Sequence, residues 1–140
     1  MIKRCQSAKK INEMINHPDI LTEGPEFDVT PFVNKGNYFM VAPGCLFGFY
    51  DQGNGMFDLH IGALKKYRGA SVMKSFKQAV DYIFNNTQCI RISGFIPMKN
   101  LAARKFGRLV GFKANGVSLK TFVNGRDYMC ENFILDREFV

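Results

Sequence analysis

The sequence predicts an α+β domain in which one mixed β-sheet carries helices on both faces. Three observations support this class. Short segments alternate apolar and polar residues, other segments repeat apolar residues every three or four positions, and turn-forming Pro, Gly and Asn separate the two kinds. The 140 residues suit a single domain, 1–140, because a second domain would leave neither half a sufficient core.

The N-terminal part predicts a short strand at residues 2–5 and then a helix over 7–18. Ser7 can cap this helix and Pro18 ends it. Residues 19–37 are rich in Gly, Pro and Asp, which indicates a loop with one helical turn. Long loops in compact domains are often functional.

The next segment predicts an antiparallel meander of three strands, at residues 38–42, 45–51 and 56–64. Pro43-Gly44 separates the first two strands. The spacer at 52–55 contains an Asn-Gly pair, which favours a tight hairpin turn.

The second half predicts two further helices and three strands. The first helix starts near Ser71, and the second starts at Asn100 and stops at Gly111, with an apolar stripe of Ala103, Phe106, Leu109 and Val110. The strands are expected at 89–96, 117–123 and 128–136, the last two joined by an Asn-Gly-Arg hairpin signal. The order is therefore αβββαβαββ after the short leading strand.

The formal net charge of +7 favours an anionic partner, such as nucleic acid, a phosphorylated cofactor or an acidic protein surface. Five basic residues surround the second late helix: Lys99, Arg104, Lys105, Arg108 and Lys113. They could contact nucleic-acid phosphates, but no nucleic-acid motif accompanies them and a solvated basic helix face is the commoner explanation. Nucleic acid is therefore the less favoured partner.

The four cysteines, Cys5, Cys45, Cys89 and Cys130, are at least 40 residues apart and form no metal-ligand motif. We therefore expect no metal. No pattern resembles a secretory signal or a membrane span, so reduced thiols in a cytoplasmic protein are expected.

The stretch "LHIGALKKYRGASVMKSF" (59–76) joins a strand to a helix through a basic turn. A helix N-terminus presents free N–H groups that bind phosphate. Gly69 would allow close approach of the backbone, and Lys65, Lys66 and Arg68 add positive charge. Taken alone, however, the stretch is more typical of an ordinary basic connection.

A second segment, "NLAARKFGRLVGF" (100–112), has the spacing N-x₂-A-x₇-G-F. Together with "KYRGAS" (66–71), it resembles the GCN5-related N-acetyltransferase (GNAT) superfamily, whose pyrophosphate loop reads R/Q-x-x-G-x-G/A. Gly69 matches the first glycine of that loop, whereas Lys66 and Ser71 depart from it.

The resemblance implies a GNAT-like sheet splayed between strands 56–64 and 89–96, with acetyl-CoA as co-substrate in the cleft. Loop amides from Tyr67 to Val72 would hold the pyrophosphate. The strand before this loop would bind the pantetheine. The implied cofactor-binding residues are Leu59, Ile61, Lys66, Tyr67, Arg68, Gly69, Ala70, Ser71, Val72, Asn100 and Ala103.

Asp58 and His60 are the candidate catalytic residues, because they lie two apart on a strand and share one face. A histidine can take the proton of an attacking amine. Both residues could equally be ordinary polar residues on a half-wet face. Many enzymes of the superfamily carry a Tyr acid where this chain has Gly107, so Tyr82, Tyr128 or water would have to replace it.

The sequence thus favours an enzyme, an acyl-CoA-dependent N-acetyltransferase that acts on a small-molecule amine or a protein amino group. The alternative is a catalytically degenerate structural or assembly protein of a bacteriophage. The run Gly94, Pro97, Asn100, Ala103 is similar to small phage-encoded acetyltransferase-like proteins. In that case the partners would be head or virion proteins, and the protein would be located in the host cytoplasm or in the virion. Neither the acceptor nor the oligomeric state has a signature.

Overall fold

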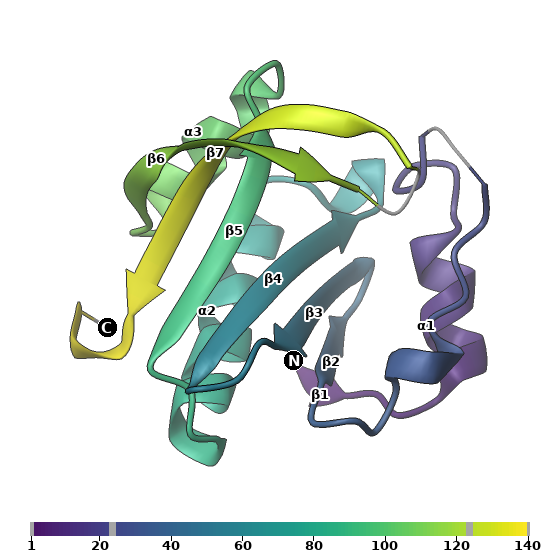
Figure 1. The fold of residues 1–140 in the computed structure, drawn as a ribbon. Helices are drawn as coiled ribbons and strands as arrows, with labels where there is room; N and C mark the ends of the chain where they lie inside the picture. The colour runs from purple at the N-terminus through teal and green to yellow at the C-terminus, as the bar shows by residue number, and fades with distance from the viewer. Residues whose placement is uncertain (1, 23–24, 123–124, 140) are drawn as a thin grey trace.

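The computed structural model describes residues 2–22, 25–122 and 125–139. Within these ranges the chain forms one seven-stranded mixed sheet, three α-helices and three short 3₁₀ turns (Figure 1). In chain order the elements are β1 (Lys3–Arg4), α1 (Ala8–Ile15), η1 (Thr30–Phe32), β2 (Tyr38–Ala42), β3 (Cys45–Asp51), β4 (Met56–Ala63), η2 (Lys65–Tyr67), α2 (Ala70–Asn86), β5 (Arg91–Pro97), α3 (Leu101–Leu109), β6 (Lys113–Thr121), β7 (Asp127–Asp136) and η3 (Arg137–Phe139).

The predicted order of elements is confirmed, and the main difference concerns β6. This strand begins at Lys113, four residues before the predicted start at 117. The register against β7 shifts between Ala114 and Val117, so the strand contains an irregularity that interrupts the alternating pattern. The predicted hairpin turn falls partly on residues 123–124, which lie outside the described residues.

The sheet has the strand order β1-β2-β3-β4-β5-β7-β6. All neighbours are antiparallel except β4 and β5, which run parallel and pair over only three positions, Met56↔Arg91, Phe57↔Ile92 and Asp58↔Ser93. Beyond Asp58 the two strands diverge, while β4 continues to Ala63 and β5 to Pro97 (Figure 1). The predicted splay of the sheet is confirmed.

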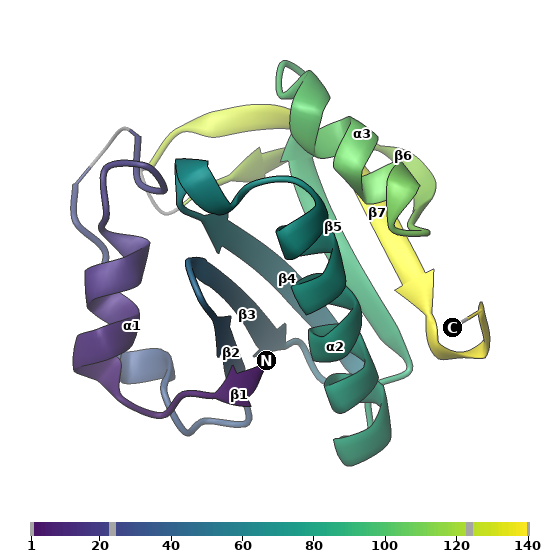
Figure 2. The same ribbon diagram turned by 180° about the vertical axis from the view of Figure 1, so that it is seen from behind.

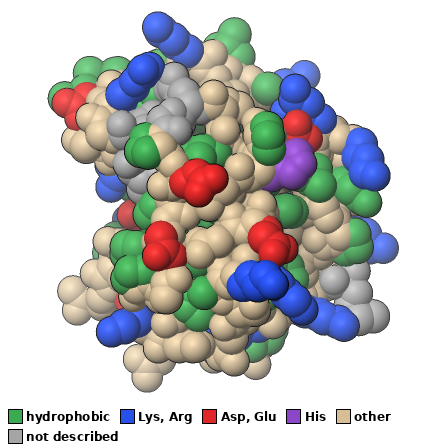
Figure 3. Space-filling model, turned by 90° about the vertical axis from the view of Figure 1, so that its right-hand side faces the viewer, with side chains coloured by type: hydrophobic (Ala, Val, Ile, Leu, Met, Phe, Trp, Pro, Cys, Tyr) green, Lys and Arg blue, Asp and Glu red, His purple; other side chains and the backbone are tan. Residues whose placement is uncertain are grey.

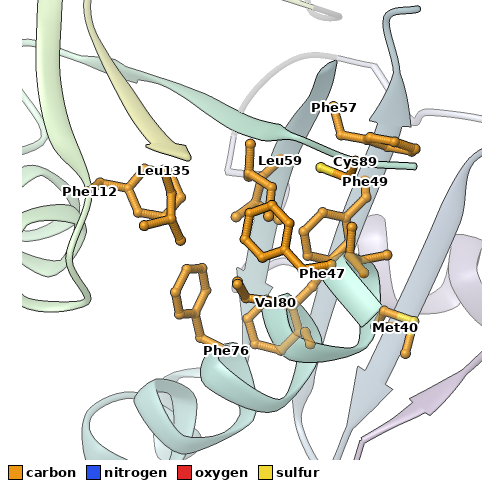
Figure 4. Packing of buried hydrophobic residues seen from close by; sticks show 14 of the residues in the cluster. Met40, Phe47, Phe49, Phe57, Leu59, Phe76, Val80, Cys89, Phe112 and Leu135 are labelled. Atoms are coloured by element: carbon orange, nitrogen blue, oxygen red, sulfur yellow. The ribbon is translucent and has the colours of Figure 1, made fainter. Parts of the chain in front are cut away.

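The helices cover opposite faces of the sheet, as predicted. Seen from behind, α2 and α3 lie across the face that α1 does not cover (Figure 2). The α2 face holds the larger core, to which Phe47, Phe57, Leu59 and Phe76 belong (Figure 4). Each of these buried side chains contributes roughly 1.5–3 kcal/mol. Alternate strand residues, including Phe39 and Leu46, form the smaller core beneath α1.

Helix α3 is fixed to the sheet by charge as well as by packing. Glu131 of β7 accepts hydrogen bonds from Arg104 at 2.9 Å and from Arg108 at 2.9 and 3.0 Å. These ion pairs turn the Arg side of the helix toward β7. The predicted apolar stripe is wrong at Leu109, which is 61% exposed, while Gly107 faces the core instead.

Ion pairing also weakens the nucleic-acid hypothesis. Two of the five basic residues in the proposed cluster, Arg104 and Arg108, are paired with Glu131. On the side where α1 lies, Lys and Arg side chains are interspersed with Asp and Glu (Figure 3).

Within the described ranges, no helix is both long and apolar enough to cross a membrane. The same residues contain no group of three or more metal-ligating side chains. Cys45, Cys89 and Cys130 are buried free thiols, and burial raises the pKa of each. A raised pKa disfavours the reactive thiolate form at these three positions.

Candidate active site

The divergence of β4 and β5 opens a groove of about 560 Å³ on the side of α2 and α3, which we call the α2–α3 groove. Leu59 and Ile61 of β4 line it on one side, and Phe95 and Ile96 of β5 on the other. Gly69 and Val72, at the start of α2, also lie in its wall. The groove is thus a mainly apolar slot bordered by a helix N-terminus.

A second groove, of about 640 Å³, lies on the other face of the sheet between β4 and the α1 segment. We call it the α1 groove. Tyr50 and Asp58 line it, together with residues of the loop that follows α1. Both grooves are lined by the same five residues at the divergence: His60, Ile61, Pro97, Asn100 and Phe122. They therefore meet where the sheet opens.

The N-terminus of α2, whose Gly69 and Val72 line the α2–α3 groove, carries amides without intrahelical partners. The first intrahelical bond runs from the Met73 amide to the Gly69 carbonyl, at 3.2 Å. The amides of Ala70, Ser71 and Val72 therefore have no partner within the helix, as in any first turn. Gly69 has φ 111° and ψ −137°, a conformation that requires glycine, and a Cβ there would meet nothing within 4 Å. The turn is shaped to accept an anion.

The remaining turn residues are less available than the sequence predicted. The Tyr67 amide donates to the Leu64 carbonyl at 2.9 Å, and the Arg68 amide to the Lys65 carbonyl at 3.3 Å. These two amides, which were predicted to bind the pyrophosphate, are therefore already paired with backbone carbonyls. The Tyr67 ring packs over Gly44 of the β2–β3 turn, and the Lys66 ammonium lies 5.2 Å from that ring.

Arg68 lines the groove, but its guanidinium is held by backbone. Its Nε donates to the Ala63 carbonyl at 3.2 Å and one Nη to the Asp19 carbonyl at 2.8 Å. The side chain therefore supplies fixed positive charge beside the turn.

Asn100 and Ala103 form the N-terminal cap of α3. The Ala103 amide donates to the Asn100 Oδ1 at 3.1 Å, which satisfies one unpaired donor of the helix. Both residues also line the α2–α3 groove. Their spacing thus has a structural cause, and both positions border the site.

The candidate catalytic residues of β4 face the predicted way. Phe57 and Leu59 are buried on the α2 face, whereas Asp58 lines the α1 groove. His60 reaches both grooves because it lies beyond the last β4–β5 pair. Ile61 also borders both grooves.

The surroundings of His60 keep its imidazole neutral. Water reaches the ring through the grooves, but the protein atoms crowded around it lower its pKa below the ordinary value of 6.5. The positive charge of Lys120 lowers the pKa further. The Tyr50 ring meets the His60 ring edge to face, with centroids 5.1 Å apart. A neutral imidazole is the form that can accept a proton.

Asp58 and Lys120 form a loose pair next to His60. Burial raises the pKa of Asp58, and Lys120, whose Nζ lies 4.0 Å from Oδ2, partly offsets this. The Lys120 ammonium also lies 4.3 Å from the centre of the Phe95 ring. Sequence reasoning missed Lys120 because only the folding of β6 over β5 brings it here.

The candidate replacements for the missing tyrosine acid differ in position. Tyr82 packs against Tyr38, with ring centroids 6.5 Å apart, and lines neither groove. Tyr128 lines the α1 groove beside Phe122, with centroids 4.9 Å apart. Gly107 lines the α2–α3 groove and lies against Ile96 and Phe133.

Comparison with solved structures defines the fold class: the chain has the fold of the GNAT acetyltransferases. Spermidine N-acetyltransferase from Vibrio cholerae, in complex with CoA and spermine, is similar with a TM-score of 0.79 at 15% identity, over 99% of this chain and 96% of that one. A protein of Salmonella typhimurium whose structure holds acetyl-CoA gives a TM-score of 0.74 at 14% identity, over 97% and 92% of the two chains. No family model and no curated protein matches the sequence.

Proposed function

We propose that this protein is an acetyl-CoA-dependent N-acetyltransferase. The observation that carries the proposal is that two grooves share His60, and one of them is bordered by the N-terminus of α2. A two-substrate transfer needs such an arrangement, because donor and acceptor must reach the same point from different sides. The fold shared with CoA-bound proteins supports the proposal.

The residues of the α2–α3 groove fit acetyl-CoA. Gly69 leaves open space where a side chain would stand, and the amides of Ala70, Ser71 and Val72 lie in the first turn beside it. We assign these residues to the pyrophosphate, with Arg68 as fixed positive charge. Leu59 and Ile61 would flank the pantetheine arm. Acetyl-CoA supplies an acyl group activated as a thioester.

His60 is assigned the proton transfers. The acceptor attacks as a neutral amine, after its ammonium form has released one proton to solvent. As the amine nitrogen bonds to the acyl carbon, His60 accepts the second proton that this nitrogen loses. It returns the proton to sulfur when the carbon–sulfur bond breaks, so the products are an amide and a free thiol. Its contact with both grooves suits both steps, and its lowered pKa provides the neutral base near pH 7. This role would replace the tyrosine that Gly107 does not provide.

Titration calorimetry with CoA and turnover with acetyl-CoA test the proposal together. Loss of the thioester absorbance is the preferred readout of turnover, because Cys5 is only partly buried and would react with thiol reagents. We expect CoA binding, and acetylation of a small amine that His60→Gln slows by about 10²–10⁴-fold. Asp81→Asn, an exposed α2 change outside both grooves, is the control.

The noncatalytic alternative predicts a different result. A phage assembly protein of this fold would consume no acetyl-CoA with any amine or protein amino group, and it would copurify with head or virion proteins. Turnover that depends on His60 would exclude that alternative as the whole function.

A further inference from the structure

We infer that the acceptor is a singly charged amine with an aromatic or bulky apolar body. This inference rests on the proposed function and assigns the acceptor to the α1 groove. Six aromatic side chains line this groove: Phe27, Phe32, Phe39, Tyr50, Phe122 and Tyr128. Such a lining fits a substrate that buries a large apolar surface.

The aromatic rings form a connected path that leads to His60. Phe27 and Phe32 stack with centroids 5.7 Å apart, and Phe32 meets Tyr50 edge to face at 5.9 Å. Tyr50 in turn contacts the His60 ring at 5.1 Å. Phe32 is 39% exposed, so the outer end of the path is open to solvent. A substrate whose body lies along these rings would place its amine at His60.

The charge in the groove matches one cation. Among the described lining residues, Asp58 is the single carboxylate, and it lies two positions from His60 on the same strand. Its contact with Lys120 spans 4.0 Å, longer than a hydrogen bond, so the carboxylate can still accept an ammonium group. One carboxylate cannot pair with the several charges of a polyamine.

The overall charge also disfavours a polyamine. The chain carries a formal net charge of +7, which repels a trication more strongly than a monocation. The similar Vibrio cholerae protein is in complex with spermine. The lining described here therefore predicts a different acceptor class for this chain.

Binding of three amines tests the inference without requiring turnover. Titration calorimetry would compare 2-phenylethylamine, n-butylamine and spermidine, each with CoA present. We expect 2-phenylethylamine to bind at least about tenfold more tightly than either of the others, the scale of one buried aromatic contact. Phe32→Ala should remove most of its advantage over n-butylamine, and Asp58→Asn should weaken both monoamines. Leu109→Ala, an exposed change outside both grooves, is the control for Phe32→Ala.

Equal or tighter binding of spermidine would overturn the inference, as would an absence of 2-phenylethylamine binding or a preference that Phe32→Ala leaves intact. Failure of the proposed function can be told apart from failure of this inference. If 2-phenylethylamine binds with the expected pattern but acetyl-CoA is not consumed, the acceptor class stands and catalysis does not.

Discussion

Gly69→Ala is the sharpest test of the pyrophosphate turn. At φ 111° and ψ −137° an alanine is strained by about 1–3 kcal/mol. For a domain of 140 residues, this corresponds to a fall in Tm of about 3–10 °C. The new Cβ would also enter the open space beside the first-turn amides of α2.

The same change should weaken CoA binding. If the methyl group displaces the phosphate from one amide, the loss of one charge-assisted hydrogen bond costs about 1.5–3 kcal/mol. Titration calorimetry should then show a Kd for CoA that is about 10 to 100 times higher. Gly111→Ala is the matched control, because Gly111 has φ 101°, a Cβ added there would meet nothing within 4 Å, and the residue lines neither groove.

The two variants separate strain from binding. Both should lower Tm, and only Gly69→Ala should lower CoA affinity. Unchanged CoA affinity in a folded Gly69→Ala protein would refute the assignment of this turn to the pyrophosphate. An equal loss of affinity in Gly111→Ala would show that destabilisation alone explains the effect.

Three further predictions concern His60 and Gly107. His60→Gln should lower kcat by about 10²–10⁴ in the thioester assay while CoA affinity stays within error; wild-type turnover in this variant would remove His60 from the mechanism. The pKa of His60 is lower in the folded state, so the unfolded chain binds the proton more readily. This residue therefore lowers the free energy of unfolding as pH falls below about 6.5. Urea midpoints should therefore fall less between pH 7.5 and about 5.5 in His60→Gln than in the wild type, and parallel falls would contradict the assigned pKa direction. Gly107→Ala should raise stability by about 0.5–1 kcal/mol, because a Cβ there meets Ile96 and Phe133 at ordinary distances of 3.6–3.7 Å; a lower Tm would show that the groove wall is tighter than described.

The elements could be predicted because their signals are local. The alternation of Phe57 and Leu59 with Asp58 and His60 follows from the two-residue period of a strand, and the structure has the same two faces. Asn100 lies at the start of α3 because its side chain caps that helix. Such signals involve residues within a few positions of one another.

The α1 groove could not be predicted, because long-range polar contacts shape it. The Asn16 side chain accepts from the Phe27 amide and donates to the Phe27 carbonyl, both at 2.8 Å. The Asn12 Oδ1 accepts from the Val29 amide, also at 2.8 Å. These bonds hold the loop after α1 against the helix and place Phe27 and Phe32 near Tyr50. Nothing in the local sequence pattern marks these asparagines as partners of the loop.

The wrong placement of Leu109 has a similar cause. Periodicity alone put Leu109 on the buried face of α3, but the pairing of Arg104 and Arg108 with Glu131 decides how the helix is rotated. Glu131 lies more than twenty positions from both arginines, so the periodicity of the helix sequence cannot reveal its effect. The pKa of Glu131 is lowered by these hydrogen bonds, which is consistent with a charged partner in a fixed position.

The two grooves are also linked through Asp19, a residue to which the sequence assigned no role. Its Oδ2 accepts from the Lys65 amide at 2.9 Å, and its carbonyl accepts from Arg68 at 2.8 Å. The bond from Lys65 lowers the pKa of Asp19. Asp19 belongs to the loop that borders the α1 groove, whereas Lys65 and Arg68 belong to the turn before α2. Two hydrogen bonds of one residue therefore tie the loop that borders the α1 groove to the turn that precedes α2, although the two segments are more than forty positions apart in the sequence.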